Sequence, residues 1–102
     1  MKINKLPEED LKDIALMLKA LAEPTRLKIM QSLHEGEMCV GDIVDEVGSS
    51  QANISKHLQL LSHYRLIRSR REGTSIYYSL AGSFVSKLCE AICGGYLESQ
   101  KK

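Results

Sequence analysis

The chain has 102 residues and lacks the features that mark membrane-embedded, secreted or disulfide-stabilised proteins. No apolar run approaches the roughly 18 residues needed to cross a bilayer. The charged start, MKINKLPEEDLKD, lacks the apolar stretch of a signal peptide. Three cysteines, an odd number, do not make a disulfide framework. We therefore expect a cytoplasmic protein without a membrane partner, whose cysteines are thiols, metal ligands or core fillers.

The residue clusters that typify enzymes are also missing. The sequence contains no glycine-rich phosphate loop, no paired catalytic carboxylates and no Ser/His/Asp constellation. Cys89 and Cys93 are separated by three residues late in a helical pattern, whereas a dithiol oxidoreductase needs Cys-x-x-Cys near a strand. We therefore predict neither catalytic residues nor an obligatory cofactor.

Charge is unevenly distributed along the chain, although the formal net charge is only +1. Residues 1–49 contain ten acidic and six basic side chains, whereas residues 50–75 contain five basic side chains and the single acid Glu72. Positive charge gathered in one segment is expected of a nucleic-acid surface. A solvated basic face would have the same composition, so charge alone leaves both interpretations open.

Apolar residues at helical spacing predict four helices before the basic segment ends. We place them at about residues 7–21, 24–34, 40–47 and 50–63. Gly48 is placed to take the left-handed conformation that ends a helix, and Ser49 or Ser50 can cap the next one. A short helix, a tight turn containing glycine and a second helix are the components of a helix-turn-helix, here residues 40–63.

The residues after the fourth helix predict a hairpin and a last helix. Strand-forming residues flank a basic stretch in which Glu72-Gly73 suits a tight turn, so a hairpin, or wing, is expected over residues 66–80. Helical spacing returns at about residues 83–99. This order predicts one domain over residues 1–102: a winged helix-turn-helix, mainly α with a small β-hairpin, extended by a helix at each end.

Four segments in this order resemble the ArsR/SmtB family of metal-sensing bacterial repressors. They are LKALAEPTRLKIM (18–30), EMCVGDIVDEVG (37–48), SSQANISKHLQLL (49–61) and LIRSRREGTSIYYSL (66–80). The resemblance implies a homodimer that pairs through its end segments, residues 1–22 and 82–100. Such a dimer reads a pseudo-palindromic double-stranded DNA operator with two recognition helices. The resemblance further implies a repressor whose affinity for DNA falls when an inducer binds.

The resemblance also places particular side chains against DNA. They lie near the start and on the outer face of the fourth helix, and on the wing. The predicted contacts are Ser50, Gln51, Ala52, Ser55, Lys56, Gln59, Arg70, Arg71 and Thr74. Elementary chemistry agrees, because glutamine pairs well with adenine edges, while lysine and arginine suit phosphates or a narrow minor groove. His57 lies one position off the outward face and is interpreted as a packing residue.

Two other interpretations of this surface stay open. The polar residues of the fourth helix could be ordinary solvated surface. The winged helix could also serve protein contact alone, although the basic wing argues against that use.

The inducer sites of the family are incomplete in this chain. A thiolate pair at the start of the third helix needs Cys-Val-Cys, but the chain has Cys39-Val40-Gly41. A related site joins Cys39 and Asp42 to a cysteine or histidine of the partner's N-terminal arm, which offers neither. A zinc site across the final helices would retain only Glu98. Its other aligned positions hold Gly82, Phe84 and Gly95.

Cys89 and Cys93 are the remaining candidates for an inducer site. Their spacing of four puts both thiols on one side of the last helix, at the expected dimer interface, where two subunits would gather four thiols. Such thiols would bind As(III) or Sb(III), supplied as arsenite or antimonite, or would oxidise to a disulfide or polysulfide bridge. Buried cysteines are also common core fillers, so a structural role stays open, as it does for Cys39. The three histidines share no ligand spacing, and no metal role is predicted for them.

Overall fold

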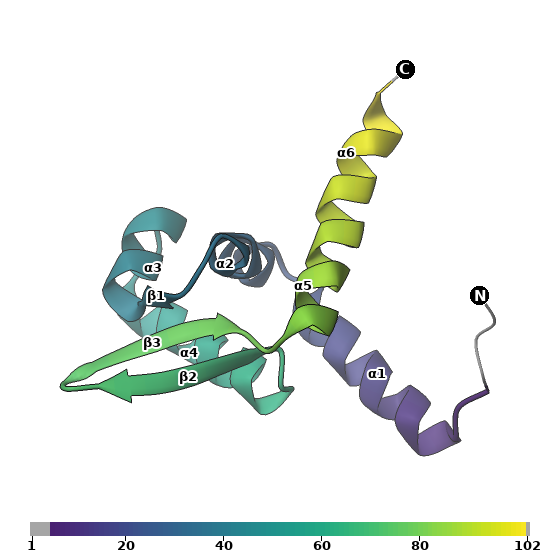
Figure 1. Ribbon diagram of the computed structural model, residues 1–102, viewed down its shortest axis with the longest axis horizontal. Helices are drawn as coiled ribbons and strands as arrows, with labels where there is room; N and C mark the ends of the chain where they lie inside the picture. Colours follow the sequence, from purple (N-terminus) through teal and green to yellow (C-terminus); the bar gives the residue numbers. More distant parts are fainter. Residues whose placement is uncertain (1–4, 102) are drawn as a thin grey trace.

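The computed structural model describes residues 5–101, so residues 1–4 of the predicted pairing segment lie outside the described part (Figure 1). The helices are α1 (Glu8–Leu21), α2 (Pro24–His34), α3 (Val40–Val47), α4 (Gln51–His63), α5 (Ser83–Cys89) and α6 (Gly95–Gln100). The strands are β1 (Met38–Cys39), β2 (Ile67–Glu72) and β3 (Ser75–Leu80). The predicted order of elements is confirmed, with two additions: β1, and a π-helical turn η1 (Glu90–Gly94) that joins α5 to α6.

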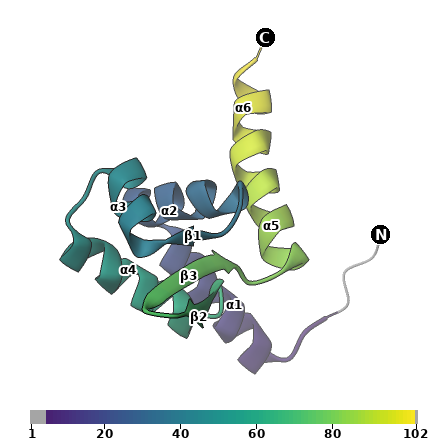
Figure 2. The ribbon, with the colours of Figure 1, turned by 60° about the vertical axis from the view of Figure 1, so that its left-hand side comes forward.

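The turn between α3 and α4 has the conformation that the sequence predicts. Gly48 is left-handed, with φ +81°, and its N–H donates to the Val44 carbonyl at 2.9 Å. Ser50 then caps α4, because its hydroxyl accepts a hydrogen bond from the Asn53 backbone N–H at 3.1 Å. In Figure 2 these two helices lie on the opposite side of the domain from α6.

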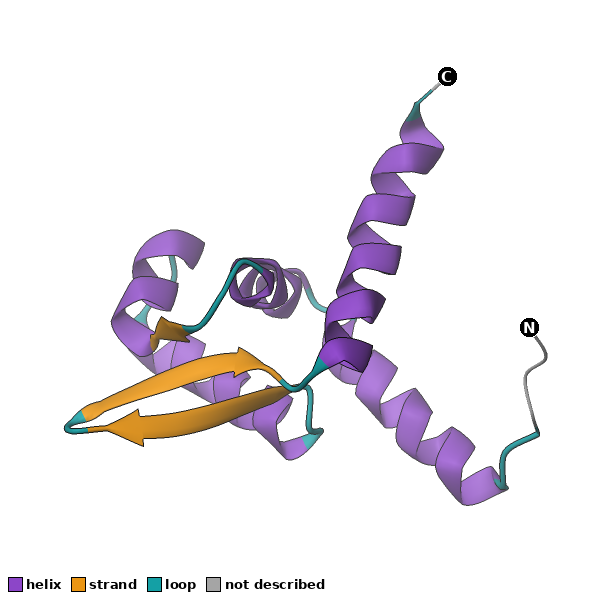
Figure 3. Cartoon of the chain, viewed as in Figure 1, coloured by secondary structure: helices purple, strands orange, loops and turns teal. Residues whose placement is uncertain are grey.

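A three-stranded antiparallel sheet in the order β1-β3-β2 extends the simple hairpin that was predicted. Arg70 of β2 and Cys39 of β1 both pair with Tyr77 of β3. β2 and β3 are joined by a tight turn in which Gly73 has φ +63°, a conformation that favours glycine. Figure 3 shows the β2–β3 hairpin projecting well beyond the helices, as a wing does.

The core lies between α2, α3, α4 and the base of the hairpin. Its largest fully buried side chains are Ile29, Met30, Ile43, Ile54, Leu58, Leu61 and Leu66. Ile54, Leu58 and Leu61 of this group form the buried face of α4. Each such aliphatic side chain contributes about 1.5–3 kcal/mol of burial free energy, so this packing holds α4 firmly against α3 and the sheet.

The two end segments leave apolar surface uncovered. α1 buries Ala20 and Leu21 against the core, whereas η1 and α6 contain no buried residue. The exposed apolar side chains of these segments include Leu11, Ile14, Leu18, Phe84, Ile92, Tyr96 and Leu97, which are 39% to 65% exposed. Figure 1 shows α1 and the rod from α5 to α6 on the side of the domain opposite the hairpin. Among residues 5–101, no helix combines the length and the apolar character needed to cross a membrane.

Candidate functional site

The outer face of α4 presents polar side chains where the sequence predicts them. Burial of Ile54 and Leu58 turns the opposite side of the helix outward. The N-terminus of α4 also carries the positive end of the helix dipole, which favours contact with phosphate. Of the predicted residues on this helix and its cap, Ser50, Gln51, Ala52, Lys56 and Gln59 are exposed, and Ser55 is half-buried.

A polar cluster ties α4 to the start of α2. His57 of α4 places Nε2 3.5 Å from Glu23 Oε2, and its Nδ1 lies 3.3 Å from Arg26 Nη1. Arg26 also donates from Nε to the Ala20 carbonyl, which joins the end of α1 to the cluster. Because the guanidinium can only donate, Nδ1 must accept and the ring proton belongs on Nε2. This placement agrees with the interpretation of His57 as a packing residue.

Glu23 is the charged centre of this cluster. Burial raises its pKa, but the hydrogen bond from the Thr25 backbone and the charges of His57 and Arg26 outweigh that effect, and its pKa is lowered overall. Within the described part of the chain, Glu23 Oε2 accepts no hydrogen bond. It lies 3.8 Å from Arg26 Nη1, so ion pairing compensates its charge.

On the wing, Arg70 is held by two carboxylates and an aromatic ring. Its Nε and Nη2 donate to the two oxygens of Glu37 at 2.7 Å each, and its Nη1 donates to Glu72 at 2.6 Å. The guanidinium also lies 4.8 Å from the ring centroid of Tyr77. The hydrogen bonds to Glu37 and Glu72 raise the pKa of Arg70, and the hydrogen bond from Arg70 lowers the pKa of Glu37.

This pairing separates Arg70 from the other predicted wing contacts. Strand alternation places Arg71 on the opposite face of β2 from Arg70. Among residues 5–101, neither Arg71 nor Lys56 forms an ion pair, and both are exposed. Thr74 in the wing turn is exposed as well. Within residues 5–101, the charge of Arg71 therefore stays uncompensated, whereas Arg70 holds the wing to the segment that carries Glu37.

Cys39 lies where α4 and the wing meet. It lines a shallow depression of about 290 Å³ together with Gln51 and Thr74. Its thiol donates to Asp42 Oδ2 at 3.3 Å, so the predicted thiol and carboxylate are neighbours. In the described part of the chain no three ligand groups gather there, and Cys39 does not line the cavity that holds Cys89 and Cys93.

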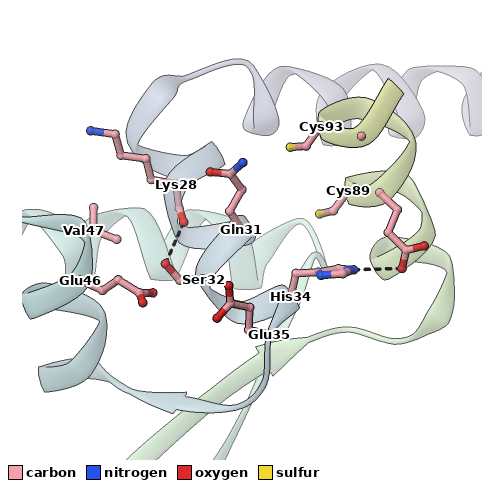
Figure 4. Close-up of a pocket in the computed structure, with 11 residues that line it drawn as sticks. Lys28, Gln31, Ser32, His34, Glu35, Glu46, Val47, Cys89 and Cys93 are labelled. Carbon is pink, nitrogen blue, oxygen red and sulfur yellow. Dashed lines mark hydrogen bonds and ion pairs between the residues drawn. The ribbon is translucent and has the colours of Figure 1, made fainter. Parts of the chain in front are cut away.

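A larger open cavity of about 610 Å³ lies between α2, the end of α3 and the segment from α5 to η1 (Figure 4). Both remaining cysteines line it: Cys89 is buried and Cys93 is half-buried. They share one side of their segment, as predicted, but that side faces α2 of the same chain. Burial raises the pKa of the Cys89 thiol, and the neighbouring Cys93 and Glu90 raise it further.

His34 is the cavity residue that sequence reasoning missed. Its Nε2 lies 2.9 Å from Glu90 Oε2, which joins the last residue of α2 to the first residue of η1. The hydrogen bond from His34 lowers the pKa of Glu90. No spacing signal announces this contact, because the two residues are 56 positions apart and meet only when α5 packs against α2.

Similarity to known proteins identifies the family to which the chain belongs. A sequence model described as "Bacterial regulatory protein, arsR family" matches residues 23–69, from the start of α2 into β2. The "Cadmium resistance transcriptional regulatory protein CadC homolog" of Staphylococcus aureus is 39% identical over 94 residues, covering 87% of this chain and 78% of that protein. The chain belongs to the arsR family.

Further relatives agree with membership of the arsR family. The nodulation protein NolR of Rhizobium meliloti is 40% identical over 88 residues, covering 86% of this chain and 72% of that protein. A homodimeric winged helix-turn-helix DNA-binding domain, fragment 1–100 of Mb0332 from Mycobacterium bovis, has a TM-score of 0.86 and 32% identity. That similarity covers 99% of this chain and 94% of the other, a possible ArsR-family transcriptional regulator. The arsR family is one of transcriptional regulators rather than enzymes, and the chain is a DNA-binding winged helix-turn-helix protein of this family.

Proposed function

We propose that the protein is a homodimeric cytoplasmic repressor that binds a pseudo-palindromic operator and releases it when a thiol-directed inducer enters the cavity of Cys89 and Cys93. The observation that carries the DNA-binding part is the exposed polar face of α4 beside an uncompensated Arg71 on the wing. α4 enters a major groove, where Gln51 reads base edges and Lys56 neutralises phosphate. Ser50, Ala52, Ser55, Gln59 and Thr74 complete the proposed contact surface.

The uncovered apolar sides of α1 and the α5–α6 rod support the dimer. A monomer would expose Leu11, Leu18 and Tyr96 to water, and large apolar side chains gathered on exposed helices mark an interaction site. A two-fold partner buries the same surface on both chains and directs two copies of α4 to successive grooves. The homodimeric state of the Mycobacterium bovis domain is in line with this proposal.

The two thiols facing one cavity support an inducer that binds sulfur. We propose As(III) or Sb(III), or a related soft metal, because soft ions prefer thiolate ligands. The name of the Staphylococcus aureus relative, which refers to cadmium resistance, is in line with an inducer of this class. Redox or reactive-sulfur sensing by the same pair is the alternative, since both thiols line one cavity.

Operator release tests the proposal. An operator is selected from random DNA duplexes by the reduced full chain, and its binding is followed by fluorescence anisotropy. We expect arsenite or antimonite to release the wild type and Cys39→Ser but not Cys89→Ser or Cys93→Ser. Release by a disulfide or persulfide donor alone would favour the alternative. Failure to select any duplex would reject the repressor function, and indifference to every one of these agents would reject arsenite, antimonite and reactive sulfur as inducers.

A further inference from the structure

We infer that Cys89, Cys93 and His34 form a site for a thiophilic divalent cation such as cadmium or zinc, in which Glu90 orients the imidazole. The inference assigns a ligand class to the cavity described above. Its consequence for operator binding rests on the proposed repressor function, whereas binding of the ion itself does not.

Three potential ligand groups from three elements face this cavity (Figure 4). Cys89 ends α5, Cys93 lies in η1, and His34 ends α2. The π-helical turn begins directly after Cys89 and contains Cys93, and such turns occur frequently at functional sites. Two thiolates and one imidazole, completed by a water molecule, make a four-coordinate set that suits zinc or a softer ion of the same charge.

The contact between His34 and Glu90 is a second observation that points to a metal. The carboxylate accepts a hydrogen bond from Nε2, so the Nε2–H tautomer leaves the Nδ1 lone pair unprotonated. Histidines that bind metals almost always donate their other N–H to a carboxylate, carbonyl or water, and that partner fixes the tautomer and the ring orientation. His34 has the arrangement of such a ligand, because Glu90 holds its Nε2–H and the two thiols line the same cavity.

The ion must gather these ligands. Among residues 5–101, no three such groups are close enough to hold a metal without rearrangement. Cys93 is half-buried and His34 is exposed, so both side chains have room to rotate toward Cys89. On binding, each thiol releases one proton to solvent as its sulfur bonds the ion, and no electrons are transferred. The ion therefore draws the end of α2 toward η1.

His34 distinguishes this site from one for arsenite. Trivalent arsenic is held by thiolates, so loss of His34 leaves the response to arsenite unchanged. A divalent cation, in contrast, loses its nitrogen ligand.

Metal titration of the reduced full-length protein tests the inference. Co(II) serves as the spectroscopic probe, because thiolate and imidazole ligands each change its absorption, and Cd(II) binding is measured by competition with a chromophoric chelator. Cys39→Ser is the matched control for loss of a thiol, and His63→Gln, on the exposed end of α4, is the control for loss of an imidazole. Circular dichroism verifies that each variant is folded.

We expect the wild type and both controls to bind one ion per chain with thiolate absorption. Cys89→Ser or Cys93→Ser should abolish that absorption, and His34→Gln should weaken binding and alter the Co(II) spectrum. Glu90→Gln should lower affinity by about 10–100-fold, the range for partners of ligating histidines. Binding by His34→Gln indistinguishable from that of the wild type would overturn the inference, as would loss of binding only in Cys39→Ser. Ion binding that leaves the operator complex intact would confirm the site and reject its role as the inducer site.

Discussion

Arg70→Gln and Arg71→Gln should have different effects on the salt dependence of operator binding. Arg71 carries a charge without an ion-pair partner in residues 5–101, whereas Arg70 is engaged by Glu37 and Glu72 at 2.6–2.7 Å. Each phosphate neutralised by a protein cation contributes about 0.9 to the slope of log K against log salt concentration. A dimer with one Arg71 contact in each subunit should therefore lose about 1.8 from that slope in Arg71→Gln.

Arg70→Gln should weaken binding by only a few-fold and leave the slope unchanged. The charge of Arg70 is already matched by Glu37 and Glu72, so the guanidinium releases no counterions from DNA. Removal of Arg70 loosens the wing, because the hydrogen bonds to these carboxylates are lost. Binding is measured by fluorescence anisotropy from about 50 to about 200 mM salt, a range over which phosphate contacts have large effects. Lys101→Gln, beyond the end of α6, is the control for loss of a distant positive charge. The reasoning is refuted if Arg70→Gln flattens the slope as much as Arg71→Gln does, or if Arg71→Gln leaves the slope unchanged.

Three other perturbations test the fold, the dimer and the wing attachment. Leu58→Ala removes a side chain that is 1% exposed, so urea denaturation should show a loss of about 2–5 kcal/mol of unfolding free energy, and an unchanged midpoint would contradict the core assignment. Leu18→Glu, on the uncovered side of α1, should yield monomers in sedimentation and weaken operator binding. Leu16→Glu, on another exposed side of the same helix, is the control and should remain dimeric. The folded-state pKa of Glu37 is lowered by Arg70, so its contribution to stability is present above the ordinary glutamate pKa and lost as pH falls through the folded value. Thermal melting in a pH series should accordingly show a smaller acid-induced loss in Glu37→Gln than in the wild type, and identical pH profiles would contradict the assigned pairing.

The sequence predicts those elements whose signals are local. Gly48 and Ser50 mark the α3–α4 turn by their backbone and capping preferences, and the spacing of Ile54 and Leu58 fixes which face of α4 is buried. β1 escapes prediction because two residues have no periodicity and pair only through β3. The meeting of His34 with Glu90 escapes it as well, because packing of distant helices creates the contact. The exposed polar face of α4 was thus predictable from local pattern, whereas the histidine that lines the cysteine cavity was not.

α2 connects the cavity to α4 and to the wing. At its start, Glu23 and Arg26 hold His57 of α4, and at its end His34 holds Glu90 of η1. The loop that follows carries Glu37, which holds the wing through Arg70.

α2 buries Ile29, Met30 and Leu33 along its length, so the helix behaves as one rigid body. Its eleven residues span about 16 Å at 1.5 Å per residue. An ion that draws the end of this helix toward η1 therefore acts on α4 and the wing together. Coupling of this kind needs no contact between inducer and DNA, because energetic coupling is carried by packed side chains and hydrogen-bond networks.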